Sequence, residues 1–259
     1  MTDGPDAPDA VVERRDGVLV IALNRPAQRN AMTLAAAEAI AAALDELDAS
    51  DDLSVGVLTG NGGTFCAGMD LKRFAAGERP VVPGRGFAGL VEAPPRKPLI
   101  AAVEGWALGG GFEVVLACDL VVAAATAKFG VPEVKRGLVA RGGGMIRLPD
   151  RLPRAIALEL LLTGDPIDAA RAAHFGLVNQ VVDEGGALDA ALELARRISA
   201  NAPLATAAAK AIAVASRDWP QSEAFARQQE LSDPVFASQD AREGATAFAE
   251  RRAPVWRGR

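Results

Sequence analysis

The sequence predicts an α/β fold with a helical C-terminal part, and three observations lead to this prediction. Short apolar segments bounded by turn residues, typical of strands, recur through the first two thirds of the chain, with helical segments between some of them. From about residue 152 onward the pattern is mainly helical. Half of the 259 residues are apolar, which allows one large core.

The first expected element is a β-hairpin. Residues 11–26 read VVERRDGVLVIALNRP, and Asp16-Gly17 in their middle is a typical two-residue hairpin turn. A helix is expected over residues 32–50, with Thr33 as its N-cap. Further strands are expected at residues 53–60, 99–105, 120–125 and 177–183.

Residues 76–98 are rich in proline and glycine, so we expect a long irregular loop there around a short helix. A helix is expected to start within residues 109–119. The later part of the chain is expected to form helices at residues 154–164, 166–176, 187–200, 203–218 and 221–233.

Composition narrows the possible functions. The net charge of −5 does not suggest a nucleic-acid partner, and no apolar run reaches the length of a membrane span. The acidic, proline-containing N-terminus has no secretory pattern, so we expect a cytoplasmic location. Cys66, Cys118 and the single histidine, His174, predict neither a disulfide framework nor a metal site. Any acid–base chemistry is therefore expected from carboxylates.

Three glycine-rich stretches stand out: residues 60–70 (GNGGTFCAGMD), 107–113 (ALGGGFE) and 140–149 (ARGGGMIRLP). None has the pattern of a P-loop or a dinucleotide-binding turn. In a helix, Gly109, Gly110 and Gly111 together would cost roughly 2–3 kcal/mol relative to alanine. Such a cost indicates close backbone approach, either to packed protein or to an oxyanion at the free N–H groups of the helix start.

Two glutamates bear on this choice. Glu113 follows the glycines inside an apolar segment, and a buried carboxylate is costly unless it is paired or hydrogen-bonded. Glu133 follows the next strand, where Pro132 fits the first turn of a short helix. If the two meet, their repulsion raises one pKa and leaves one acid and one base. Surface or salt-bridged glutamates remain the alternative.

Taken together, five segments resemble the crotonase superfamily of enoyl-CoA hydratases and isomerases, in the family's order and spacing. They are LNRPAQRNAM, GTFCAGMDLK, PLIAAVEGWALGGGFEVVLACDLVVAAATAKFGVPE, LLLTGDPIDAARAAHFGLVNQVV and EGATAFAERRAPVW. The resemblance implies a spiral of ββα units with a helical C-terminal region. It divides the chain into a disordered tail (residues 1–10), a spiral core with an acyl-CoA site (11–195) and a helical oligomerisation region (196–259).

The resemblance also implies roles for single residues. The thioester oxygen is expected between the backbone N–H groups of Met69 and Gly110, and Glu113 and Glu133 are expected to hold the reacting water. The implied assembly is a homo-trimer or hexamer, with CoA entering only as part of the substrate and no separate cofactor or metal. Positions matching the family's substrate- and CoA-binding residues are Gln28, Arg29, Ala67, Asp70, Leu71, Lys72, Phe248 and Arg251.

Some positions leave alternatives open. Met69 is bulkier than the alanine common in hydratases, and Arg141 stands where many have a short proline- and glycine-containing turn. The expected reaction is hydration of a trans-2-enoyl-CoA. An enoyl-CoA isomerase and a crotonobetainyl-CoA hydratase are alternatives within the fold, and a non-catalytic acyl-CoA-binding oligomer is the alternative of another class.

Overall fold

The computed structural model describes residues 7–259, and its frame is a six-stranded sheet in the order β1-β2-β3-β6-β8-β11. β1 and β2 form the predicted antiparallel hairpin, and every later neighbour is parallel. The strands are β1 (Ala10–Arg15), β2 (Val18–Leu23), β3 (Val55–Gly60), β6 (Leu99–Val103), β8 (Leu120–Ala124) and β11 (Gln180–Val182).

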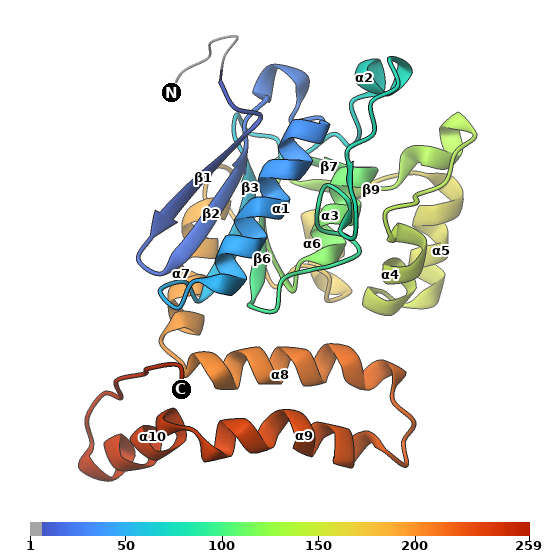
Figure 1. Cartoon of the computed structure of the whole chain (residues 1–259). Helices are drawn as coiled ribbons and strands as arrows, with labels where there is room; N and C mark the ends of the chain where they lie inside the picture. The colour runs from blue at the N-terminus through green and yellow to red at the C-terminus, as the bar shows by residue number, and fades with distance from the viewer. Residues whose placement is uncertain (1–6) are drawn as a thin grey trace.

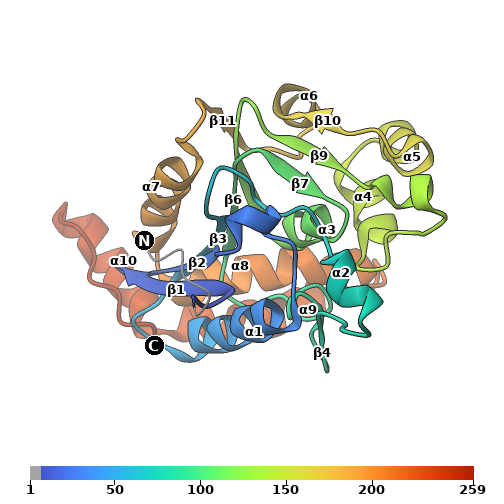
Figure 2. The same cartoon turned by 90° about the horizontal axis from the view of Figure 1, so that it is seen from above.

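A second sheet runs beside the first. It contains β7 (Trp106–Leu108), β9 (Lys128–Gly130) and β10 (Ile167–Asp168), and Cys66 bridges to Ala107 at its edge. The chain passes from β6 to β7, through α3 (Gly110–Ala117), and then to β8 beside β6 and β9 beside β7. Each circuit therefore adds one strand to each sheet, which is the expected spiral (Figure 2).

The remaining elements cover these sheets or follow them (Figure 1). A two-stranded hairpin, β4 (Val81–Val82) and β5 (Gly86–Phe87), lies between α2 and β6. Three short 3-10 helices are η1 (Pro26–Gln28), η2 (Pro132–Arg136) and η3 (Ser216–Asp218). The other helices are α1 (Leu34–Ala49), α2 (Leu71–Ala75), α4 (Gly144–Arg151), α5 (Arg154–Thr163), α6 (Ala169–His174), α7 (Ala187–Ser199), α8 (Pro203–Ala215), α9 (Ala224–Ala237) and α10 (Gln239–Glu250).

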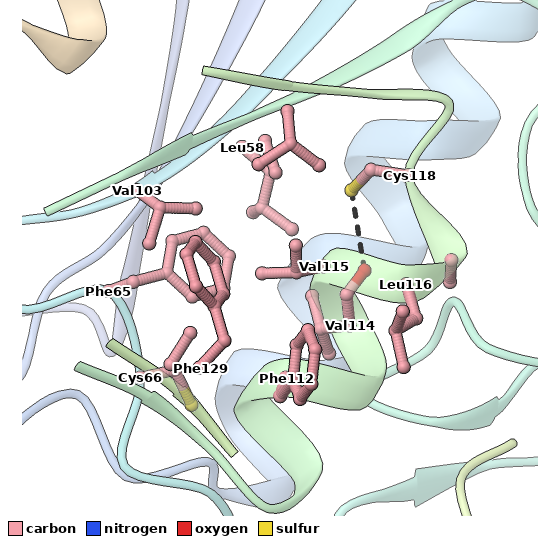
Figure 3. Packing of buried hydrophobic residues seen from close by; sticks show 14 of the residues in the cluster. Leu58, Phe65, Cys66, Val103, Phe112, Val114, Val115, Leu116, Cys118 and Phe129 are labelled. Carbon is pink, nitrogen blue, oxygen red and sulfur yellow. Dashed lines mark hydrogen bonds between the residues drawn. The ribbon is translucent and has the colours of Figure 1, made fainter. Parts of the chain in front are cut away.

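Alternation along the strands builds a core on both faces of the large sheet. In β2, Leu19 and Ile21 face α1 and α3, whereas Val18 and Val20 pack with α7. This is the two-residue period of a strand, and it explains why β2 is almost continuously apolar. α3 lies at the centre, with all eight residues buried (Figure 3).

The structure corrects several expectations. Within residues 76–98 there is no helix, because Gly84 and Gly86 take positive φ and a β-hairpin forms there instead. β1 begins at Ala10 and Asp9 pairs with Arg25, so the tail predicted for residues 1–10 extends too far; residues 1–6 lie outside the described part. The boundary predicted after residue 195 falls inside α7, so the helical region begins after that helix.

Residues 203–259 form a C-terminal arm of α8, α9 and α10 beneath the spiral core (Figure 1). Between residues 7 and 259 no single helix is long and apolar enough to cross a membrane. The segments 187–199 and 203–218 meet that test only together, and they bend by 107° between them.

Candidate active site

Each of the three positions 109–111 at the start of α3 requires glycine for a different physical reason. Gly109 has φ 54° and ψ −127°, a backbone conformation that favours glycine. A Cβ on Gly111 would overlap the backbone oxygen of Cys66, so this position is packed against protein. A Cβ on Gly110 would overlap the ring of Phe87. Packing and close approach at the helix start therefore both contribute.

Two backbone N–H groups at and beside the start of α3 have no hydrogen-bond acceptor among residues 7–259. Within residues 7–259, the N–H groups of Met69 and Gly110 donate no hydrogen bond to the protein. The Cβ position of Gly68, the residue before Met69, lies 3.4 Å from the nitrogen of Gly110. The loop that carries Met69 is thus packed directly on the N-terminus of α3, where the helix dipole favours negative charge.

Hydrogen bonds hold the Met69 loop in place. The Met32 N–H donates to Gly68 over 2.8 Å, and the Asp70 N–H donates to Met32 over 3.1 Å. The Asp70 carboxylate caps α2 and pairs with Arg25 at 3.0 Å, with both side chains largely buried. These contacts position the Met69 N–H independently of its side chain, so the bulk of Met69 does not alter the donor.

Glu113 lies on the first turn of α3 and is only 4% exposed. The Gly144 N–H, at the start of α4, donates to Glu113 Oε1 over 2.8 Å. Burial raises the pKa of Glu113 to about 7; the charge of Glu133 adds to this rise, and the N–H groups of Gly144 and Gly142 oppose it. Glu113 can therefore exchange a proton near neutral pH.

Glu133 lies on η2 and approaches the same place from the other side. Its Oε1 lies 3.0 Å from the Cβ position of Gly109, one residue before the free N–H of Gly110. Its Oε2 is buried and has no hydrogen-bond partner among residues 7–259. Burial raises the pKa of Glu133 as well. An unpartnered buried carboxylate oxygen is costly in a folded protein, so this atom indicates a ligand position.

The residues expected to contact CoA divide into two groups. Gln28, Arg29, Ala67, Leu71 and Lys72 lie on neighbouring segments joined by a hydrogen bond from the Ala67 N–H to the Arg29 oxygen. Arg29 and Lys72 are exposed, as phosphate-binding cations would be. The structure thus brings this group together on adjacent segments.

Three other expected positions lie differently. The Asp70 carboxylate is already occupied by Arg25 and by α2, so it supports the loop rather than facing outward. Phe248, which is 87% exposed, lies on α10, and Arg251 is the first residue after that helix; both belong to the C-terminal arm. Within a single chain α10 lies in the arm, apart from α3, which carries Glu113 (Figure 1).

Several residues of the site were not predicted. Gly142 and Gly144 hold the Glu113 carboxylate, and Phe87 covers Gly110. The glycine run at 142–144 was visible as a pattern, but its partner was not. Nothing in the irregular stretch 76–98 singles out Phe87, because its contact arises only from tertiary structure.

Sequence comparisons agree with this geometry. Residues 13–259 match the model of the family described as enoyl-CoA hydratase/isomerase. An enoyl-CoA hydratase of Mycobacterium tuberculosis is 44% identical over 263 residues, covering 97% of each chain. A carnitinyl-CoA dehydratase of Salmonella typhi is 44% identical over 255 residues, covering 95% of this chain and 97% of that protein.

Solved structures agree as well. An enoyl-CoA hydratase of Mycobacterium marinum matches with a TM-score of 0.96 at 57% identity, covering 98% of this chain and 100% of that one. A carnitinyl-CoA hydratase of Mycobacterium avium matches with a TM-score of 0.79 at 46% identity, with the same coverage. From the family model and these relatives, the chain belongs to the enoyl-CoA hydratase/isomerase family of the crotonase superfamily.

Proposed function

We propose that this enzyme, a hydro-lyase of the family, adds water across the double bond of a trans-2-enoyl-CoA thioester. The observation that carries the proposal is the buried, unpartnered Oε2 of Glu133 beside the Glu113 carboxylate and the free N–H groups. Water and a polarised thioester are the reactants that these groups suit. A non-catalytic acyl-CoA binder would gain nothing from two buried carboxylates.

The Met69 and Gly110 N–H groups would bind the thioester oxygen. When water adds, negative charge develops on that oxygen, and two fixed donors at a helix N-terminus stabilise the charge without reorganising. One such donor contributes about 100- to 1,000-fold in other acyl-transfer enzymes.

The two glutamates would perform the proton transfers. Burial raises both pKa values, that of Glu113 to about 7, so Glu113 can take up or release a proton near neutral pH. The proposed step starts with one proton on the pair, and interacting carboxylates titrate as a unit. The water oxygen bonds to C3 of the enoyl group while one of its protons passes to the ionised carboxylate. The protonated carboxylate gives its proton to C2, so the atoms balance with no added cofactor.

The remaining assignments are part of the same proposal. Arg29 and Lys72 would contact the CoA phosphates, and Phe248 and Arg251 would reach the ligand of a neighbouring subunit in a trimer or hexamer. CoA enters only as part of the substrate, and the proposed location is cytoplasmic.

A second candidate substrate is crotonobetainyl-CoA. The relatives named for carnitinyl-CoA favour it. Two segments of this sequence, GFAGLVE and AFAERRAPVWRGR, also resemble the branch of the family that hydrates crotonobetainyl-CoA. An isomerase acting on a 3-enoyl-CoA is the third candidate, since it needs only one of the two glutamates.

One assay separates these candidates. Purified protein is incubated with crotonyl-CoA, with crotonobetainyl-CoA and with a 3-enoyl-CoA. The loss of enoyl-thioester absorbance is followed for the first two, and formation of the 2-enoyl product for the third. We expect the highest kcat/KM with crotonyl-CoA, and a higher value with crotonobetainyl-CoA would favour the second candidate. Turnover of the 3-enoyl-CoA alone would contradict the proposal.

A further inference from the structure

Arg147 occupies an unusual place beside the site. It lies on α4, three residues after Gly144, whose N–H binds Glu113, so the two positions share a helix face. Its guanidinium folds back across Gly143, where a Cβ would overlap it. The side chain is partly buried and, among residues 7–259, has no ion pair with a carboxylate. A partly buried cation without an ion pair requires an explanation.

The first contact of Arg147 is with the loop before β6. Its Nη2 donates to the backbone oxygen of Val91 over 2.6 Å. The N–H groups of Leu90 and Val91 each bond to the Phe87 oxygen over 3.3 Å, so Phe87 and Val91 belong to one tight turn. The Phe87 ring rests on Gly110, next to the proposed oxyanion donor. Arg147 thus anchors the turn that places this ring.

The second contact is electrostatic. The charged groups that face Glu113 are Glu133 from η2 and Arg147 from α4. The carboxylates whose charges act on Arg147 in turn are Glu113 and Asp150, the latter on its own helix. Arg147 therefore acts on Glu113, and Arg136 on η2 acts on Glu133; each positive charge favours the ionised form of its carboxylate.

We propose that Arg147 is a positioning residue that couples the Phe87 turn to Glu113. It holds the ring against Gly110 through the Val91 oxygen and places a positive charge on the helix turn whose N–H binds Glu113. The inference rests on the proposed roles of Glu113 and Gly110. It adds that the first turn of α4 serves the site twice, through the Gly144 N–H and through the Arg147 guanidinium.

Two substitutions separate the two contacts. Arg147→Met removes both the charge and the hydrogen bond. Its kcat/KM for crotonyl-CoA should fall about tenfold or more, and its pH profile should move upward by about half a unit or more, because the pair loses a stabilising cation. Arg147→Lys keeps the charge but not the planar donor group. Its pH profile should stay in place while kcat/KM falls.

A double-mutant cycle tests the link to Phe87. If Arg147 acts through the Phe87 turn, Arg147→Lys should cost little further activity in a Phe87→Ala background. Fully independent losses, with the pH profile of Arg147→Met unchanged, would overturn the proposal.

Arg151 provides the matched control. It lies on the same helix and donates to the Leu116 and Cys118 oxygens, away from the Phe87 turn. Arg151→Met should lower the unfolding temperature without moving the pH profile, and an equal profile change in both Met variants would reduce Arg147 to a structural role. If Arg147→Met does not fold, Arg147→Lys and the cycle still decide. A fully active Glu113→Gln would instead refute the proposed function.

Discussion

The α3 helix of the core and the α8 and α9 helices of the C-terminal arm bury their surfaces in opposite ways. Every residue of α3 is buried, whereas α8 and α9 bury none. Phe225 and Phe236 on α9 are 78% and 81% exposed, and Phe248 on α10 is 87% exposed. The α3 helix is thus fully packed within the core, while the arm presents large apolar side chains that a single chain does not cover.

Polar contacts hold the arm to the core. Lys210 Nζ donates to the Pro95 and Lys97 oxygens and to Asp119, at 2.6–2.9 Å, and Arg217 pairs with Asp150 at 3.2 Å. Such contacts orient an element but stabilise it little at exposed positions. Large apolar side chains exposed together on one part of a protein are typical of association surfaces, which agrees with the proposed trimer or hexamer. Chemistry is therefore expected to depend on the core, and assembly on the arm.

The largest expected effect comes from Gly110. Gly110→Pro removes the donor N–H and should lower kcat by at least about 1,000-fold. Gly110→Ala is the matched control, because its Cβ disturbs Phe87 in the same way but the N–H remains. The assay is crotonyl-CoA hydration by proteins of normal mass and circular dichroism. Equal activity of the two variants would remove Gly110 from the oxyanion role.

The glutamates come next. Glu113→Gln and Glu133→Gln should each reduce kcat/KM by at least about 100-fold, the usual contribution of a general acid or base. The double variant should lose less than the product of the two effects, because both act on one water. Multiplicative losses would indicate independent roles. The molecular mass should not change in any of these variants, since the arm is untouched.

Replacing Glu113 by glutamine should lower activity but raise the free energy of unfolding at high pH. Its folded pKa of about 7 lies above the unfolded value, so the folded state loses stability as pH rises between about 4.5 and 7. Glu113→Gln mimics the protonated form, so at pH 8 its free energy of unfolding should exceed that of the wild type by up to about 3 kcal/mol. At pH 4 the difference should vanish. An advantage that does not depend on pH would mean that Glu113 is not held in a charged, buried state.

Substitutions of exposed aromatic residues in the arm should weaken assembly rather than abolish catalysis directly. Phe225→Ser and Phe236→Ser together should shift the mass measured by light scattering from a trimer or hexamer toward a monomer. A buried aromatic anchor at an interface contributes at least about 2 kcal/mol, or about 30-fold in the association constant. Val11→Ser, a change of an exposed apolar residue on β1, should leave the mass unchanged. A monomeric wild type would contradict this prediction.

Local signals predicted the parts of the fold that depend on neighbouring residues. The hairpin at Asp16-Gly17 formed as expected, and the Thr33 side chain accepts from the Ala36 N–H as an N-cap. α4 was missed because ARGGG reads as a loop, although its glycines are where Glu113 approaches. β7, β9 and β10 are two or three residues long, too short for a periodic pattern.

The site divides in the same way. Glu113 and Gly110 were located by their motif, and the structure places them at one helix start. Phe87 and Arg147 act through contacts between segments distant in sequence, and those contacts require the completed spiral. The sequence contains no local trace of either.

The smallest expected effect concerns Arg141, which tests whether the core also selects the acyl group. Arg141 is exposed and directly precedes Gly142, whose Cβ position lies 2.7 Å from Glu113 Oε2. An arginine next to a residue that contacts Glu113 can turn toward an acyl tail or remain in solvent. If it turns inward, it would pair with a terminal carboxylate on the substrate. Arg141→Ala should then leave crotonyl-CoA hydration nearly unchanged and reduce kcat/KM about tenfold for an enoyl-CoA with a terminal carboxylate, equivalent to about 1.4 kcal/mol. The exposed Arg154 on α5 offers a control substitution in the same assay. If kcat/KM relative to the wild type is the same for both substrates in both variants, Arg141 has no contact with the acyl group, and other residues of the core select it.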